Sequence, residues 1–185
     1  MYGPPIMPYQ PDNIWRAVGR NAPKWKTADD TNRFRRGIYV VWRRAAPYPS
    51  FVNFDAPDRA ACVVNRPRTN TPLQALTLLN DPAYLEMALG LAQRMIEGGD
   101  SVKERIDHGF RLCVARGPGG EDLAILAGLY QREQARLKAN PVLADKLFKG
   151  VSKYKVPAEI DRVDLATWFA VANALLNLDE AITNG

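Results

Sequence analysis

From residue 71 to the end of the chain, apolar residues recur every three or four positions, the spacing that gathers them on one face of an α-helix. Capping residues, prolines at first helical positions, and Gly or Asn-Pro pairs divide this part of the chain into segments. The pattern predicts helices over residues 72–79, 82–97, 102–116, 123–139, 142–148 and 161–176. Five or six helices joined by short loops indicate an all-α fold, a compact helical bundle.

The clearest signals stand at three of the helix starts. Thr71 and Asp81 are each followed by Pro, so each is placed to cap a helix that begins with that proline. Ser101 and Glu104 have the spacing of a capping box, in which each side chain binds the backbone N–H of the other residue.

Two of the predicted helices carry distinct apolar stripes. The stripe of the first consists of Leu73, Leu76 and Leu79. The stripe of the last is the strongest in the chain and consists of Leu165, Trp168, Phe169, Ala172, Leu175 and Leu176. Asn173 and Asn177 lie one turn apart on the last helix, and we expect them to hydrogen-bond a neighbouring loop, because Asn is a poor interior helix residue.

The first 50 residues follow a different pattern. Pro4, Pro5, Pro8, Pro11 and Pro23 punctuate them too often for a regular helix or strand. We expect an irregular, basic and aromatic arm over residues 1–50 that packs on a helical domain over residues 51–185, the two making one structural domain. The aromatic anchors of this arm would be Tyr2, Tyr9, Trp15 and Trp25.

Residues 35–44, RRGIYVVWRR, are ambiguous. Ile38, Val40 and Trp42 alternate as in a strand, whereas Ile38, Val41 and Trp42 fit one face of a helix. The β-branched residues favour a strand, but no second segment is an obvious pairing partner. We therefore favour a helix.

Composition and charge narrow the classes of partner. A chain of 185 residues with 46% hydrophobic and 24% charged residues can bury a core without disulfides or metals. The net charge of +5 is uneven, because residues 1–70 carry 12 Lys or Arg and 5 Asp or Glu, whereas residues 71–185 carry 13 and 15. Such a basic segment can meet nucleic acid, an acidic polymer or an acidic face of its own protein. Since aromatic and proline residues interleave with the arginines, we expect the last of these. No apolar stretch reaches the roughly 20 residues that cross a bilayer, so we expect no membrane insertion. No signal peptide is visible, so either the domain is cytoplasmic or an export signal lies in a longer parent chain.

The inventory of reactive side chains is small. His108 is the single histidine, and it falls inside a predicted helix as an ordinary helix residue. The two cysteines, Cys62 and Cys113, form neither a C-x-x-C-H haem attachment nor a cluster of zinc ligands. We expect no catalytic residue, no metal and no cofactor. We also expect both cysteines to be free thiols, since Cys113 lies on an apolar helix face, where a thiol acts as a small hydrophobe.

The segment FDAPDRAACVVNRPRTNTPLQALTLLNDP, residues 54–82, carries a family resemblance. Together with PYQPDNIW near the start, RRGIYVVWRR before it and ATWFAVANALLNLDEAITNG at the end, it resembles the C-terminal uncharacterised domain of large planctomycete proteins. In that family the domain often follows cytochrome-c-like domains. The resemblance covers nearly the whole chain, and it implies that the chain begins partway into the usual domain of the family.

The resemblance implies an exported or periplasmic protein whose haem chemistry belongs to other domains. We therefore interpret the chain as a non-catalytic structural or interaction module of a larger exported, haem-linked protein, with the other domains of that protein as its partners. The alternative interpretation is a substrate-binding or catalytic domain that acts on extracellular polysaccharide.

Two clusters in the recognised segment are candidates for a binding site. FDAPDR places two carboxylates beside an arginine, where they could act as acid and base or cap a short turn starting at Pro57. NRPRTN adds two guanidinium forks, which suit carboxylate, sulfate or phosphate groups or form internal salt bridges that fix the loop. The candidate ligands for an anionic or carbohydrate group are therefore Asp55, Asp58, Arg59, Arg66, Arg68 and Asn70.

Overall fold

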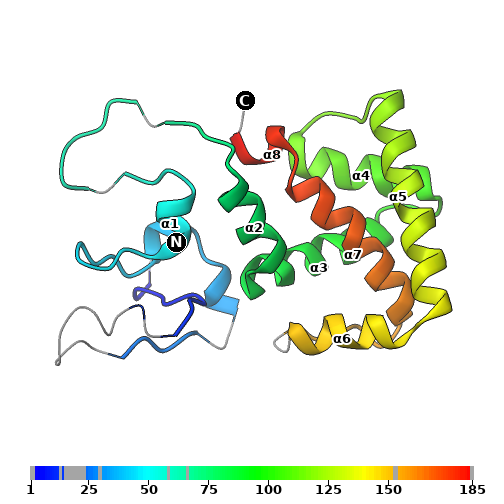
Figure 1. Ribbon diagram of the computed structural model, residues 1–185, viewed down its shortest axis with the longest axis horizontal. Coiled ribbons are helices and arrows are strands. Elements are labelled where there is room, and N and C mark those ends of the chain that lie inside the picture. The colour runs from blue at the N-terminus through cyan, green and yellow to red at the C-terminus, as the bar shows by residue number, and fades with distance from the viewer. Residues whose placement is uncertain are drawn as a thin grey trace. The chain divides into compact units, whose positions relative to one another are not determined.

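The structure, a computed structural model, describes residues 3–12, 14, 24–28, 31–57, 59–65, 67–151 and 154–183. These residues form α-helices and short 3-10 helices, with one isolated β-bridge and no strand among them (Figure 1). The predicted all-α fold class is confirmed. By its internal contacts the chain divides into two compact units, an N-terminal unit over Met1–Gln74 and a C-terminal unit over Ala75–Gly185.

The elements follow the predicted order. The N-terminal unit contains η2 (Thr31–Phe34), η3 (Gly37–Tyr39), α1 (Pro49–Asn53) and the first turn of α2 (Pro72–Asn80). The C-terminal unit continues with α3 (Pro82–Glu97), α4 (Val102–Val114), α5 (Gly120–Ala139), α6 (Val142–Gly150), α7 (Arg162–Leu176) and α8 (Asp179–Thr183). The six predicted helices correspond to α2–α7, whereas α1 and α8 are short helices that the pattern did not indicate.

Local capping explains why these helices begin where they do. Asp81 accepts a hydrogen bond of 2.8 Å from the backbone N–H of Ala83, at the start of α3. The predicted capping box opens α4, with 3.2 Å from the Glu104 N–H to Ser101 Oγ and 2.9 Å from the Ser101 N–H to Glu104 Oε2. Each of these bonds satisfies a backbone donor that the first turn of a helix leaves without a partner.

The core of the C-terminal unit surrounds α7, which packs against α3, α4, α5, α6 and α8 (Figure 1). Its most extensive contacts are with α3 and α5. Leu165, Trp168 and Val171 are fully buried, and the Trp168 ring lies 4.5 Å from the Tyr130 ring, measured between centroids. The strongest stripe in the sequence therefore forms the centre of the bundle, because a helix buried on most sides needs apolar residues around most of its circumference.

Gly109 lets α4 approach α3 closely. A Cβ atom at this position would lie 2.7 Å from both Cγ and Sδ of Met95, and Met95 is completely buried. A side chain at this position would force the buried methionine to shift within a close-packed core, so packing favours glycine here.

The N-terminal unit has a small core of its own. Ile6 and Val40 form a parallel β-bridge, with 2.8 Å from the Ile6 N–H to the Tyr39 carbonyl and 3.0 Å from the Val41 N–H to the Ile6 carbonyl. Ile6, Val40 and Tyr48 are buried, and Trp25, Tyr39 and Phe51 pack against them. Of the predicted aromatic anchors, Trp25 donates a hydrogen bond of 2.8 Å to the Pro8 carbonyl, while Tyr2 and Trp15 lie outside the described residues.

The helix favoured over residues 35–44 is wrong. Only η3 forms there, and Val40 then continues in extended conformation into the bridge with Ile6. The pairing partner is a single residue within the proline-rich arm, a segment that carries no strand pattern. A segment of this kind could not be recognised as a partner from periodicity.

The face assigned to the first predicted helix is also wrong, although α2 itself is present. The exposed fractions of Leu73, Leu76 and Leu79 are 57%, 56% and 49%. Gln74 and Leu78, one turn apart on another side of α2, are instead buried, with exposed fractions of 1% and 8%. The polar side chain of Gln74 is inside because it has hydrogen-bonding partners there.

Candidate functional site

Four residues of the recognised segment form a hydrogen-bonded chain, which we call the loop latch. Asp55 Oδ2 accepts hydrogen bonds from the Thr69 N–H at 2.9 Å and from Thr69 Oγ1 at 2.7 Å. Thr69 Oγ1 accepts from Gln74 Nε2 at 3.0 Å, and Gln74 Oε1 accepts from the Thr71 N–H at 2.7 Å. The latch joins the two ends of the loop over residues 56–68 to the start of α2.

Sequence reasoning identified Thr71 as a cap but missed Gln74 and Thr69. The spacing of Thr71 and Gln74 is that of a capping box, and the Gln74 N–H donates back to Thr71 Oγ1 at 3.3 Å. That signal could have been read from the sequence. Asp55 and Thr69 are 14 positions apart in the sequence, so no local sequence pattern predicts the hydrogen bond between them.

The backbone of this loop is strained at two positions. Asp55 and Arg59 adopt φ angles of 56° and 61°, in the left-handed region. Such a conformation costs a non-glycine residue about 1–2 kcal/mol, although Asp tolerates it better than most residues do. The hydrogen bonds of the latch offset this cost at Asp55 and join it to Thr69.

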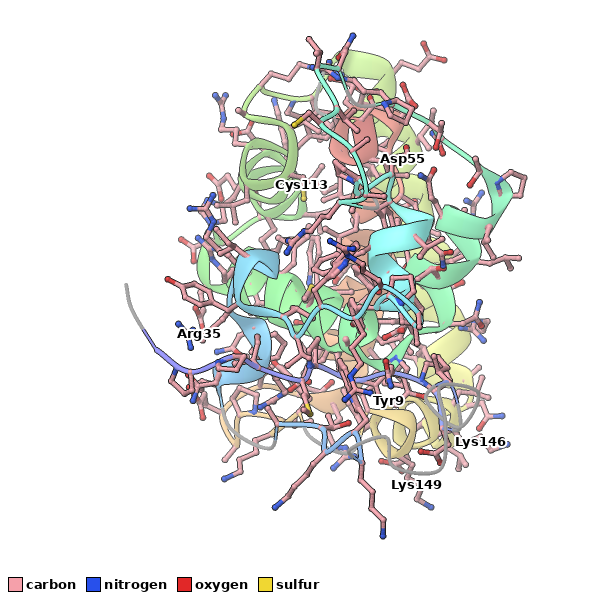
Figure 2. The ribbon with its side chains drawn as sticks, turned by 90° about the vertical axis from the view of Figure 1, so that its left-hand side faces the viewer. Tyr9, Arg35, Asp55, Cys113, Lys146 and Lys149 are labelled. Atoms are coloured by element: carbon pink, nitrogen blue, oxygen red, sulfur yellow. The ribbon has the colours of Figure 1, made fainter. Side chains whose placement is uncertain are left out.

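The structure describes four of the six candidate residues, and Asp58 and Arg66 lie outside the described residues. Asp55, labelled in Figure 2, accepts the two hydrogen bonds that Thr69 donates. The Arg59 side chain is exposed, and its guanidinium carbon lies 4.6 Å from the centroid of the Trp42 ring. Arg68 and Asn70 are exposed on the other arm of the loop, on either side of Thr69.

The loop held by the latch presents apolar side chains to solvent. Residues 60–65 are all exposed, and the exposed fractions of Val63 and Val64 are 46% and 104%. Cys62 is among them. The described candidate residues thus position a loop and carry charge at its ends.

An apolar groove in the C-terminal unit is a second candidate site, one that sequence reasoning missed. It has a volume of about 680 Å³ and receives side chains from α2, α3, α5, α6 and α7. Its lining consists of Ala75, Leu79, Leu85, Leu129, Glu133, Leu147, Phe169, Ala170, Asn173, Ala174 and Asn177. These positions come from five helices, so no single helical stripe could have revealed the groove.

The two asparagines at the groove bond to each other and not to the neighbouring loop that we expected. Asn177 Nδ2 donates to the Asn173 carbonyl at 2.9 Å and to Asn173 Oδ1 at 3.0 Å. Asn177 Oδ1 is buried and has no hydrogen-bond partner. The Asn177 side chain therefore caps the last turn of α7, and its buried Oδ1 remains without a hydrogen bond.

A polar pocket of about 540 Å³ lies beside His108, between the end of α3, the first turns of α4 and the start of α5. Its carboxylates are already engaged. Asp107 accepts from Arg111 Nε at 2.7 Å, which holds the pKa of Asp107 below its ordinary value, and a backbone hydrogen bond from Ser101 lowers the pKa of Glu104. The imidazole lies over Gly98, where a Cβ atom would come within 2.3 Å of its Cδ2.

Both cysteines are free thiols in the structure. Burial raises the pKa of Cys113, on α4, to about 11 (Figure 2), whereas Cys62 is exposed. Within the described ranges, no three His, Cys, Asp or Glu side chains gather as metal ligands would. None of the helices in the described part of the chain combines the length and apolar character needed to cross a bilayer.

Comparisons with known proteins identify the family. A family model described as PSD1, a protein of unknown function (DUF1553), matches residues 1–130. No curated protein matches the chain, and no solved structure does. The match includes the recognised segment over residues 54–82, so the resemblance to an uncharacterised domain is confirmed, although the match ends within α5. The chain therefore belongs to the PSD1 (DUF1553) family.

Proposed function

We propose that this chain is a non-catalytic structural or interaction module of a larger exported, haem-linked protein, and that it docks other domains of that protein. The observation that carries the proposal is the apolar groove of the C-terminal unit. The exported location and the haem domains rest on the family resemblance of the segment over residues 54–82.

The groove has the properties of a docking site. Its lining is mainly aliphatic and aromatic, and Leu79 keeps half of its surface in contact with water. Covering such a surface stabilises a complex by about 25 cal/mol per Å² of apolar area removed from water. Grooves between helices commonly receive the apolar face of a partner helix, and the occupant we propose is such a segment from another domain of the larger protein.

The loop latch supports a structural role for the candidate residues. Acid–base catalysis would need a carboxylate that can reach a substrate proton. Asp55 Oδ2 instead receives two hydrogen bonds from Thr69, and its strained backbone serves to shape the loop. This arrangement favours an interaction module over the alternative of a catalytic domain that acts on polysaccharide.

Site-specific photo-crosslinking tests the proposal in the native protein. A benzophenone amino acid in place of Leu79 reports what lies in the groove, and the same replacement at Ile125, an exposed residue of α5 outside the groove, is the matched control. We expect the Leu79 variant to crosslink to one discrete segment, within a polypeptide that carries a haem-attachment motif, and the Ile125 variant not to do so. Equal crosslinking from both positions would contradict docking in the groove. Hydrolysis of a polysaccharide by the purified chain, abolished by Asp55→Ala, would favour the catalytic alternative.

A further inference from the structure

Basic residues are concentrated in the N-terminal unit. Residues 71–74 carry no charge, so the net charge of +7 counted over residues 1–70 belongs to the whole of this unit, and the C-terminal unit carries −2. The described basic residues of the unit are Lys24, Lys26, Arg33, Arg35, Arg36, Arg43, Arg44, Arg59 and Arg68. Its described acidic residues are Asp12 and Asp55, and Asp55 is engaged in the loop latch. The excess of positive charge indicates an anionic partner.

The guanidinium groups of three arginines in this unit lie over aromatic rings. The guanidinium carbons of Arg33, Arg35 and Arg59 lie 4.4, 3.7 and 4.6 Å from the ring centroids of Phe34, Tyr39 and Trp42. Stacking uses the face of a guanidinium group and leaves its in-plane N–H donors available to a planar anion. Arg35 uses one of these donors for the Pro4 carbonyl, at 3.0 Å (Arg35 is labelled in Figure 2). Arginines held in this way lose less conformational entropy when they bind an anion.

The arginines form two groups along one segment. Arg35 and Arg36 precede η3, and Arg43 and Arg44 follow the extended residues after it. Arg59 joins the second group, because its guanidinium lies on Trp42. Arg36 and Arg43 are seven positions apart in the sequence, so the segment carries positive charge at more than one point. A linear polymer with repeated charges can contact several such groups at once.

The aromatic rings of the unit argue against a single-stranded nucleic acid. Trp25 stacks on Tyr48 with 6.1 Å between centroids, and Trp42 stacks on Phe51 with 5.4 Å between centroids. Arg59 also lies against Trp42. Proteins that bind single strands use free ring faces as platforms for bases, and these rings are occupied by one another and by arginine.

We propose that the N-terminal unit binds a linear anionic polysaccharide, one that bears carboxylate or sulfate groups, through Arg36, Arg44 and Arg59. Guanidinium forks match both groups in geometry and charge. These arginines belong to a different unit from the groove, so a test of this site does not depend on whether a partner docks in the groove.

Fluorescence anisotropy of the whole chain with labelled glycans tests the site. Labelled polygalacturonate supplies carboxylates and labelled dextran sulfate supplies sulfates. The glycan that binds with the higher affinity identifies the preferred anionic group. We expect binding in 50 mM salt that weakens at least about tenfold in 200 mM salt, because ionic contacts release condensed counterions. The triple variant Arg36→Gln, Arg44→Gln, Arg59→Gln should bind about 10- to 100-fold more weakly, since each basic contact with an anionic surface contributes on the order of 1 kcal/mol.

The matched control removes three charges from exposed positions of the C-terminal unit, with Arg94→Gln, Arg132→Gln and Lys138→Gln. We expect this control to bind about as tightly as the unaltered chain, and circular dichroism to show that both variants are folded. An equal loss of affinity in control and triple variant would overturn the site, because net charge alone would then explain binding. Binding of an oligothymidylate more tightly than either glycan would overturn the ligand class, and no binding of either glycan in 50 mM salt would overturn both.

Discussion

Replacing Asp55 with Ala should open the loop over residues 56–68 and leave the C-terminal unit folded. The substitution removes the acceptor of two hydrogen bonds from Thr69, at 2.9 and 2.7 Å. It also places Ala at a φ angle of 56°, which Asp tolerates better. The hydrogen bond that Gln74 Nε2 donates to Thr69 Oγ1 would persist, because it does not involve the carboxylate.

The expected size of the effect follows from these contacts. Hydrogen bonds to a charged group contribute about 1.5–3 kcal/mol each, and the lower value applies here because Asp55 is partly exposed. Two such bonds give about 3 kcal/mol, or roughly a 100-fold change in the opening equilibrium of the loop. Asp55→Asn keeps an acceptor oxygen and a residue suited to the left-handed region, so it should lose only about 1 kcal/mol.

Hydrogen exchange measured by NMR reads this equilibrium directly, because the Thr69 amide is itself the donor in the latch. Protection of that amide should fall towards the unprotected rate in Asp55→Ala, by up to about 100-fold, and far less in Asp55→Asn. Amides of α7 should keep their protection in both variants.

Two outcomes would refute this reasoning. Unchanged protection of the Thr69 amide in Asp55→Ala would show that the carboxylate does not hold the loop. An equal loss of protection throughout α7 would show that the substitution unfolds the whole chain, so that the latch is not a local device.

Three further predictions concern glycine packing, thiol reactivity and a helix cap. Gly109→Ala should lower the free energy of unfolding by about 1–2 kcal/mol through overpacking against α3, whereas Gly128→Ala, where a Cβ atom meets nothing within 4 Å, should raise it by about 0.5–1 kcal/mol. Urea titration measures both, and stabilisation by both substitutions would contradict the packing argument. With a disulfide reagent, Cys62 should react faster than Cys113, because Cys62 is exposed whereas burial raises the pKa of Cys113 to about 11; equal rates would contradict this. Hydrogen bonds at its cap lower the pKa of Glu104, so its contribution to stability is present above about pH 4.5 and is lost as pH falls through the lowered folded value. Glu104→Gln should flatten that part of the pH profile in urea titrations, and an unchanged slope would contradict the assignment.

The helices of the C-terminal unit were predictable because their determinants are local. Asp81 and the pair of Ser101 and Glu104 make the capping bonds that their spacing predicts. Each signal lies within four residues of the backbone group that it binds. The apolar stripe of α7 was equally clear in the sequence. This helix is buried on most sides, around Trp168, and therefore carries many apolar residues.

The misses share a different cause, which is dependence on partners far away in the chain. Val40 is extended because Ile6 pairs with it, and Asp55 serves as a latch because Thr69 reaches it. Gln74 lies on the buried side of α2 because hydrogen bonds satisfy its amide there. The leucine spacing therefore predicted the wrong face of this helix as buried. The hydrogen bonds that Asp55 accepts from Thr69 are contacts that periodicity does not encode.

The central position of α7 has a consequence for the order in which parts of this protein fold during synthesis. Domains generally fold as units during synthesis, from the N-terminus onward. The N-terminal unit can complete its own small core once residue 74 has emerged, whereas α3 must wait until α7, at Arg162–Leu176, has left the exit tunnel. Through that interval the apolar face of α3 is open to chaperones or to premature association. The matched stretch over residues 1–130 ends before α7, so it contains α3 without the helix that covers it.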